Sequence, residues 1–404
     1  MKKTLAKALA ISSIVLIASV AAAETRGAWH ITRRDDGGIH LDITRGTSMH
    51  WGQSMDLAAF SGLSSAAWTT SSETPVKFDM VRDAGTIHFT GTFVDGDGVG
   101  RFTFEPNRNY TATLRSLGVS GDVSDEEELF SLAMHDVSTA FIRDMQSLGY
   151  RENLDQYIAF RIHGVSPQFV RDLCAMGYDK LSADQLVTFR IHGVSPQFIR
   201  EMKDLGYTLS ADELVTFRIH GVKGDFVRGM RDLGVRGLDA DNLVTLRIHG
   251  ATVDFVRDLR DLGYDKLSAD QLVAFRIHGV SPQFIREMKD LGYSVDADDL
   301  VAFRIHGVSS DFVRGMKDLG VRDLDADNLV GMRIHGTTID FVRELADLGY
   351  KNLSSDELVS MRIHGVSPKF IRELRDAGYS GIPVEKLVEM RIHGISADDV
   401  RRMK

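Results

Sequence analysis

The chain has 404 residues and a formal net charge of −9 at pH 7, from 57 acidic residues against 48 lysines and arginines. This acidic balance argues against a general nucleic-acid binder, because that function needs a basic surface. The single cysteine excludes an internal disulfide, so packing and helix capping must stabilise the fold.

The first 23 residues have the three parts of a secretory signal peptide. Three lysines in the first seven residues are followed by a mostly apolar stretch at 8–20 and by an A-x-A cleavage site at Ala21–Ala23. The apolar stretch is shorter than the roughly 20 residues of a membrane span. We therefore expect an exported protein, periplasmic or extracellular, with no membrane span after cleavage. Loss of the three lysines changes its net charge from −9 to −12.

Residues 24–105 are rich in glycine, threonine, serine and aromatic residues and show the period-2 alternation of strands. We predict a small antiparallel β domain with two tight turns, at 83–85 and 95–98. The acidic turn Asp95–Gly98 resembles part of a calcium loop, but it lacks the third acid and the closing glutamate, so we favour a hairpin turn. The predicted strands cover 29–32, 39–43, 76–81, 86–93 and 100–104.

Four histidines of this domain, His30, His40, His50 and His88, have no spacing typical of metal ligands. The sequence therefore predicts no metal and no cofactor here. Residues 106–124 are expected to form a joining helix and a linker.

Residues 125–404 form a tandem array. The tetrapeptide Arg-Ile-His-Gly recurs every 28 or 29 residues, and Ala133–Asp136 is a degenerate further copy. An 86-residue period is superimposed, so the array grew partly by copying three units at once. The tetrapeptide begins at Arg161, Arg190, Arg218, Arg247, Arg276, Arg304, Arg333, Arg362 and Arg391.

Each unit reads as two helices of about ten residues. In the unit that begins at Leu181, Ser182 and Gln185 form a capping box, and Gly193 supplies the left-handed residue that ends the first helix. Ser195 caps the second helix, and Gly206 ends it. Such short helices are stable only when packed on neighbours. The sequence thus predicts a mostly α fold, an α-solenoid of about ten helical hairpins preceded by the β domain.

The apolar residues of the first helix, such as Leu186, Val187, Phe189 and Ile191, spread over more than half of the helical wheel. We therefore expect the first helix to be the more buried of the two. The second helix has its apolar residues on one arc.

One histidine recurs in every unit, and a metal site is one interpretation. Packed helices lie about 8–10 Å apart, which is too far for shared zinc ligands. We favour a role for these histidines at the helix C-terminus, where His192 with Gly193 and His249 with Gly250 form C-caps.

The arginine of the tetrapeptide lies inside the apolar arc, so its charge must be paired or must reach water. An acidic residue recurs at the start of the same helix. We predict an Arg–Asp ladder between units; an arginine that reaches water along its own helix, or an anion-binding groove, are the alternatives. The predicted ladder comprises Arg190, Arg218, Arg247, Arg276, Arg304, Arg333 and Arg362 with Asp184, Asp212, Asp241 and Asp270.

Tyrosines recur after the second helix and are replaced by Val235 and Val321 in two units. Because valine serves equally well, we favour an apolar contact at the helix end over a carbohydrate-stacking row. Residues that vary between units, such as Thr188, Lys223, Thr252 and Ser309, are the expected binding positions.

The unit Leu-Val-x-Phe-Arg-Ile-His-Gly-Val-Ser-Pro-x-Phe-Ile-Arg-x-Met-x-x-Leu-Gly-Tyr resembles repeats of exported bacterial proteins without an assigned function. It is also similar to repeats appended to membrane metalloproteases of the β-lactam-sensing antirepressor type. The β-domain stretches 81–86, 91–93 and 100–104 resemble the region before those repeats. The protease motif His-Glu-x-x-His is absent here, so the resemblance implies a sensory or partner-binding role and no peptidase activity.

No other nucleophile, phosphate-loop or metalloprotease motif occurs in the chain. We therefore expect a non-enzymatic exported scaffold that binds a protein or peptide partner through its solenoid, in envelope sensing or regulation, as a monomer or weak oligomer. The alternative is an envelope ligand sensor or enzyme with a small-molecule site in the β domain. A purely structural spacer is a third interpretation.

Overall fold

The computed structural model describes residues 25–34, 38–45, 49–68, 70–121, 123 and 125–402. The expected signal peptide and its cleavage site lie outside these residues. The chain forms two compact units, one ending at Pro196 and the other beginning at Gln197. No helix of the described part is both long enough and apolar enough to cross a membrane.

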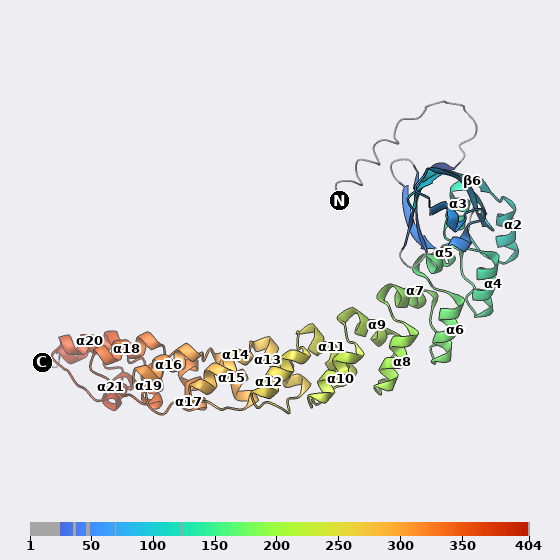
Figure 1. The fold of residues 1–404 in the computed structure, drawn as a ribbon. Helices are drawn as coiled ribbons and strands as arrows, with labels where there is room; N and C mark the ends of the chain where they lie inside the picture. Colours follow the sequence, from blue (N-terminus) through green and yellow to red (C-terminus); the bar gives the residue numbers. More distant parts are fainter. Residues whose placement is uncertain are drawn as a thin grey trace. The chain divides into compact units, whose positions relative to one another are not determined.

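The first unit begins with a six-stranded antiparallel sheet of strand order β3-β2-β1-β6-β5-β4 (Figure 1). This confirms the predicted antiparallel β domain. Two short 3-10 helices, η1 (Leu57–Ala59) and η2 (Ser65–Trp68), follow β3. The strands are β1 (Arg26–Arg33), β2 (Ile39–Arg45), β3 (Met49–Met55), β4 (Thr74–Arg82), β5 (Gly85–Val94) and β6 (Asp97–Pro106).

Strand β3 was not predicted, because its sequence contains a central glycine and no β-branched residue. The acidic turn at 95–98 is a hairpin, as favoured from the sequence. Asp95 and Gly96 connect β5 to β6, and both have positive φ, which suits a two-residue hairpin turn.

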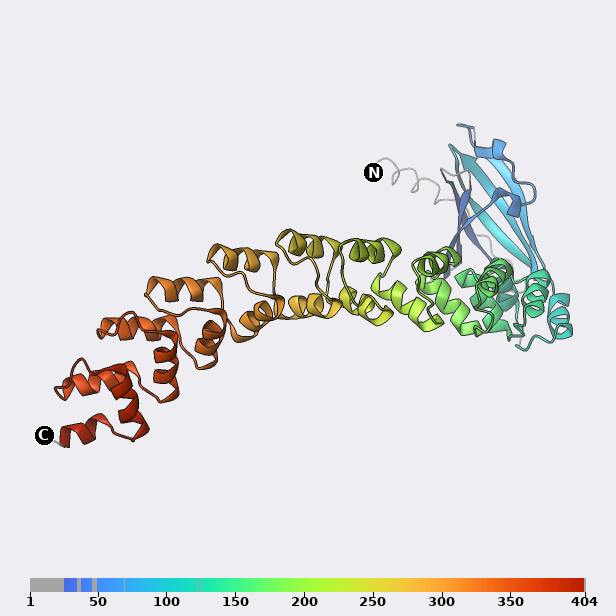
Figure 2. The same ribbon diagram turned by 90° about the horizontal axis from the view of Figure 1, so that it is seen from below.

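An aromatic cluster fills the concave side of the sheet. Trp29 of β1 packs edge-on against Phe78 of β4, with ring centroids 5.3 Å apart, although two strands separate β1 from β4. The sheet must therefore be strongly curved (Figure 2). Gly91 and Gly100 make room for the indole, because a Cβ added at either position would lie 2.6 Å from the Trp29 ring.

Helix α2 (Asn109–Ser116) follows the sheet and is the predicted joining helix. The next helix, α3, covers the sheet: Phe130 is fully buried and stacks on Phe102, with centroids 5.5 Å apart. The first unit of the helical array is thus part of the β-domain core.

The array confirms the predicted solenoid of helical hairpins. In the second compact unit, first helices pack on neighbouring first helices and second helices on second helices. The first helices are α3 (Glu126–Met134), α5 (Leu154–His163), α7 (Ala183–His192), α9 (Ala211–His220), α11 (Ala240–Ile248), α13 (Ala269–His278), α15 (Ala297–His306), α17 (Ala326–Ile334), α19 (Ser355–Ile363) and α21 (Val384–Ile392). The second helices are α4 (Thr139–Ser147), α6 (Pro167–Ala175), α8 (Pro196–Asp204), α10 (Gly224–Asp232), α12 (Val253–Asp261), α14 (Pro282–Asp290), α16 (Ser310–Asp318), α18 (Ile339–Asp347), α20 (Pro368–Asp376) and α22 (Ala397–Arg402).

Helix boundaries follow the capping signals. Ser182 and Gln185 form the predicted capping box, and Gly193 ends the helix with a φ of +70°. The expectation that first helices are the more buried was wrong. In α13, Leu272 and Phe275 are fully buried, but Ile277 is 56% exposed. Its neighbours α11 and α15 cover the two flanks of α13, so one stripe of the helix stays open.

Candidate interaction surface

From α5 to α21, the open stripe of each first helix carries one isoleucine, and we call these nine residues the isoleucine column. Each side chain is between 54 and 57% exposed, whereas the leucine or tyrosine five residues earlier in the same helix is buried. Large exposed apolar groups that recur at equivalent positions are typical of interaction sites. The column comprises Ile162 and Ile191 in the first compact unit and Ile219, Ile248, Ile277, Ile305, Ile334, Ile363 and Ile392 in the second.

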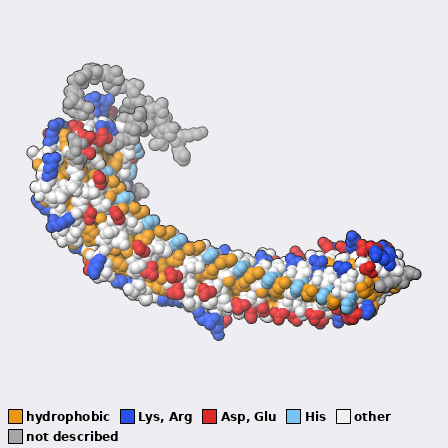
Figure 3. Space-filling model, turned by 180° about the vertical axis from the view of Figure 1, so that it is seen from behind, with side chains coloured by type: hydrophobic (Ala, Val, Ile, Leu, Met, Phe, Trp, Pro, Cys, Tyr) orange, Lys and Arg blue, Asp and Glu red, His pale blue; other side chains and the backbone are white. Residues whose placement is uncertain are grey.

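Histidines accompany the isoleucines. In the second compact unit, apolar and histidine side chains form a row along the array (Figure 3). From α5 to α19, an aspartate near the start of the first helix, such as Asp241 or Asp270, is exposed and precedes the isoleucine by seven residues. Two helical turns separate them, so both lie on the same face. The surface therefore presents carboxylates, isoleucines and imidazoles.

The arginines of the tetrapeptide contact the preceding helical hairpin of the array. Their partners there are not the predicted aspartates. Arg247 donates from Nε to the carbonyl oxygen of His220 over 3.2 Å, and its guanidinium lies 5.1 Å from the centre of the Phe226 ring. Arg276 makes the same two contacts, with the carbonyl oxygen of His249 and with the ring of Phe255. The cation is thus held by a helix C-terminal carbonyl and an aromatic face.

The same stacking on a phenylalanine recurs throughout, at 4.9–5.1 Å from guanidinium carbon to ring centre. No ion pair among the described side chains joins the predicted arginines to Asp184, Asp212, Asp241 or Asp270. The aspartates, two turns away at the other end of the helix, stay exposed. Each of these arginines is therefore held by a backbone carbonyl and a phenylalanine ring of the preceding repeat, and the predicted Arg–Asp ladder is absent among the described residues. We call these recurring contacts the ladder of carbonyls and rings.

The tetrapeptide glycine has two roles. It ends the first helix in the left-handed region, with a φ of +70° at Gly250, and it leaves room for the arginine of the next unit. A Cβ added to Gly250 would lie 3.3 Å from Nη2 of Arg276. The predicted C-caps are present: His192 is the last residue of α7 before Gly193, and His249 is the C-cap of α11 before Gly250.

The hydroxyl groups of the recurring tyrosines donate hydrogen bonds to backbone carbonyl oxygens of the following repeat. Tyr264 donates to the carbonyl oxygen of Val295 over 2.7 Å, and Tyr293 donates to that of Leu324 over 2.6 Å. Where valine replaces tyrosine, a backbone bridge serves instead. After Val235, Arg236 pairs with Ser268, and Arg322 pairs with Ser354 in the unit 86 residues later. The hydroxyl groups are therefore used within the fold, as the favoured structural interpretation requires.

These tyrosines predict a loss of stability at alkaline pH. Burial, with a smaller contribution from nearby carboxylates, raises the pKa of Tyr264 and Tyr293 above the usual value. Because the folded-state pKa exceeds the unfolded one, the stabilisation is complete below about pH 10 and is lost as pH rises through the folded-state pKa. We expect the unfolding temperature to fall above pH 10, together with the appearance of phenolate absorbance. A phenolate absorbance near pH 10 that the folded chain shows and the folded variant Tyr264→Phe lacks would contradict this, because that difference comes from Tyr264 alone. The variant Tyr264→Phe should be less stable at neutral pH but less sensitive to alkali.

Two of the expected binding positions are helix caps. The side chains of Thr252 and Ser309 accept hydrogen bonds from the backbone N–H groups of Phe255 and Phe312. Lys223, at the equivalent position of α10, makes no such bond. The difference between Thr252, Ser309 and Lys223 is thus a difference in helix capping.

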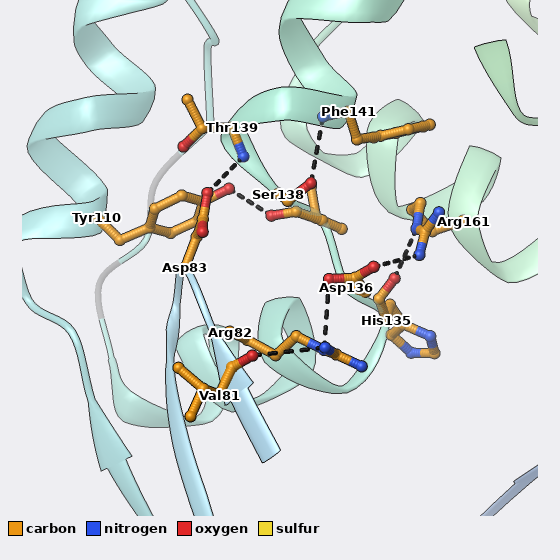
Figure 4. A network of polar contacts seen from close by, with 11 residues as sticks. Val81, Arg82, Asp83, Tyr110, His135, Asp136, Ser138, Thr139, Phe141 and Arg161 are labelled. Atoms are coloured by element: carbon orange, nitrogen blue, oxygen red, sulfur yellow. Dashed lines mark hydrogen bonds and ion pairs between the residues drawn. The ribbon is translucent and has the colours of Figure 1, made fainter. Parts of the chain in front are cut away.

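A polar network connects strand β4 to helix α5 through Asp136, which follows helix α3 (Figure 4). Asp136 occupies the tetrapeptide glycine position and has a φ of +52°. Its Oδ1 lies 3.3 Å from Nε of Arg82 in β4, and its Oδ2 lies 2.7 Å from Nη2 of Arg161 in α5. The degenerate repeat copy therefore carries an aspartate where it must bind two arginines.

The variant Asp136→Asn should destabilise the first compact unit by about 1–2 kcal/mol. The Arg82 side chain is only 18% exposed and would lose its counter-charge, although the 38% exposure of Asp136 limits the effect. The three tryptophans of the chain all precede residue 69, so denaturation followed by tryptophan fluorescence reports this unit. Asp95→Asn is the matched control, because Asp95 also has positive φ and lies in the same compact unit. Equal effects of both variants would argue against the network.

A cavity of about 390 Å³ adjoins this network. Its lining includes Trp51 and Gln53 of β3, Arg82, His135 and Arg161. Burial and the charge of Arg161 lower the pKa of His135, and its ring meets Trp51 edge-on at 6.4 Å. The cavity thus offers an aromatic wall, guanidinium groups and a neutral imidazole to a small ligand.

The sequence missed one further cluster. The sheet register brings His30, His40 and His50 together around Asp42. His30 in β1, and His40 and Asp42 in β2, alternate with apolar residues, and this pattern could have placed them on one face of the sheet. His50 could not be placed with them, because β3 was not recognised as a strand. In comparisons with known proteins, no protein-family model matches this chain and no curated protein is significantly similar to it.

Proposed function

We propose that this chain is a non-enzymatic exported scaffold whose solenoid binds a protein or peptide partner along the isoleucine column. The exposure of an isoleucine at the same position of each first helix from α5 to α21 supports this most directly. The core of the array does not use these side chains, since leucine and phenylalanine fill it.

The chemistry of the surface suggests the kind of partner. Exposed aspartates accompany the isoleucines on the same face, and the chain as a whole is acidic. The complementary partner is an extended or helical segment with apolar side chains flanked by lysine or arginine. Such a partner would place several apolar side chains against successive units. Envelope sensing or regulation is the setting in which we propose that it acts.

The test compares two triple variants of the full chain. Ile248→Asn, Ile277→Asn and Ile305→Asn together remove part of the column, while Arg257→Ser, Arg286→Ser and Arg314→Ser change the exposed side of second helices. Peptides selected on the unmodified chain from a displayed library, and partners captured from an envelope extract, are then titrated against both. We expect at least a tenfold loss of affinity with the isoleucine variant and little change with the control. Equal binding to both would refute the proposal.

The alternative is an envelope ligand sensor with a small-molecule site in the β domain, and the cavity beside Trp51 and Arg161 favours it. The variant Trp51→Ala distinguishes the two. A ligand or partner that depends on Trp51 and not on the isoleucine column would support the sensor.

A further inference from the structure

Three histidines surround one aspartate on the convex face of the sheet. Trp29, Ile31, Leu41 and Ile43 point to the core, so the residues between them point away from it. The strand register places His30 of β1 and Gly52 of β3 on either side of Asp42. His40 lies two residues before Asp42 on β2, and His50 lies two residues before Gly52 on β3, which puts both on this face.

The distances within the cluster are short. Oδ1 of Asp42 lies 3.4 Å from Nε2 of His40 and 3.7 Å from Nε2 of His50, and Oδ2 lies 3.9 Å from Nδ1 of His30. The other nitrogen of His40 lies 3.3 Å from Oγ of Ser54. That contact orients Nε2 of His40 towards the carboxylate.

Gly52 keeps a space open in the middle of the cluster. A Cβ at this position would lie 2.7 Å from Oδ1 of Asp42 and 3.1 Å from Nε2 of His40. Any other residue would therefore press on the two atoms that face each other there. The glycine that weakens the strand signal in the sequence is the residue that leaves this space.

We propose that His30, His40, His50 and Asp42 form a binding site for a divalent transition-metal ion of the zinc class. Imidazole nitrogens and carboxylate oxygens are ligands that such ions prefer. Bonds of about 2.0–2.2 Å in tetrahedral geometry place neighbouring ligand atoms about 3.3–3.6 Å apart. The contacts of Asp42 with His40 and His50, at 3.4 and 3.7 Å, are close to that separation.

Binding requires the rings to turn. In the described part of the chain, no group of three or more histidine, cysteine, aspartate or glutamate side chains could hold a metal ion as these side chains are now placed. The side chains of His30, His40 and His50 are 46, 40 and 71% exposed, so rotation about their side-chain bonds meets little packing. Asp42, at 25% exposure, is the most fixed member, and the rings would close around an ion at its Oδ1.

The other histidines of the chain provide the comparison. His88 has Asp79 at 2.7 Å from Nδ1 and Glu105 at 3.2 Å from Nε2, so both ring nitrogens are already engaged. Its hydrogen bond with Asp79 is the main cause of its raised pKa. The first helices carry one histidine per unit, without a neighbouring histidine on the same helix. The convex-face cluster differs from both.

The experiment titrates Zn²⁺ into the full mature chain by calorimetry and follows Co²⁺ binding by its visible absorption. We expect one ion that binds more tightly than the array histidines do. The double variant His40→Ala, His50→Ala should lose it, with at least about a tenfold weaker binding. Gly52→Ala, which removes no ligand, should weaken binding by filling the space, and circular dichroism checks that each variant folds.

His88→Ala and the pair His249→Ala, His278→Ala are the controls and should leave this ion in place. Unchanged Zn²⁺ stoichiometry and affinity in the double variant would overturn the proposal. It would also be overturned if the unmodified chain binds no ion more tightly than the array histidines, or if His88→Ala has the same effect.

Discussion

Replacement of Arg247 by methionine is expected to destabilise the array by about 2–3 kcal/mol. A hydrogen bond from a charged donor contributes about 1.5–3 kcal/mol and a partly exposed cation–π contact about 0.5–1 kcal/mol. Arg247 makes both, to the carbonyl of His220 and the ring of Phe226. Methionine retains the apolar stem, so the loss reports the guanidinium itself.

The salt dependence of this loss separates the two kinds of ladder. A carbonyl and a ring carry no net charge, so high salt should change the effect of Arg247→Met little. An ion pair with an aspartate would make the effect shrink in salt. Arg257→Met is the control, because Arg257 is exposed and, among the described residues, its ion pair is with Asp254 three residues away on its own helix. We expect a small, salt-sensitive change there; a similar loss from both variants would contradict the ladder of carbonyls and rings.

Three glycine-to-alanine variants in the second compact unit should change stability in a fixed order. Gly250→Ala forces a left-handed conformation on alanine and presses on Arg276, and should cost more than the roughly 1–2 kcal/mol of the backbone term alone. Gly206→Ala carries the backbone term only, because nothing lies within 4 Å of its Cβ position. Gly331→Ala, inside α17 and in open space, should stabilise by about 0.5–1 kcal/mol.

Local measurement is needed for both sets of variants, because units of a solenoid can unfold separately. Hydrogen exchange of the amides of α9 to α13 reports Arg247 and Gly250, and exchange in α17 reports Gly331. Equal costs at Gly206 and Gly250 would show that the contact with Arg276 contributes nothing. A destabilised Gly331→Ala would contradict the assignment of its Cβ position to open space.

The sequence by itself determined the helical hairpins, because their signals are local. Most helices of the array begin at a residue whose side chain bonds the backbone three residues on, and most are followed by a glycine in the left-handed region. Ser182 with Gln185, and Gly193, act as the sequence predicted. The turns of the β domain are local in the same sense, and the Asp95–Gly96 turn was recognised from them.

Only the tertiary structure decided which faces are buried and which residues meet. The helical wheel placed Ile191 and Arg190 among apolar residues, but a wheel does not show that neighbouring units cover two flanks and leave a third side open. The carbonyl groups that bind the arginines lie 26 or 27 residues away, in the preceding repeat. The cluster of His30, His40 and His50 around Asp42 depends on the register of strands β1, β2 and β3. Strand β3 could not be recognised from the sequence, because its central residue is a glycine. Local chemistry fixes where each element begins and ends, while contacts distant in sequence are set by packing that no single segment contains.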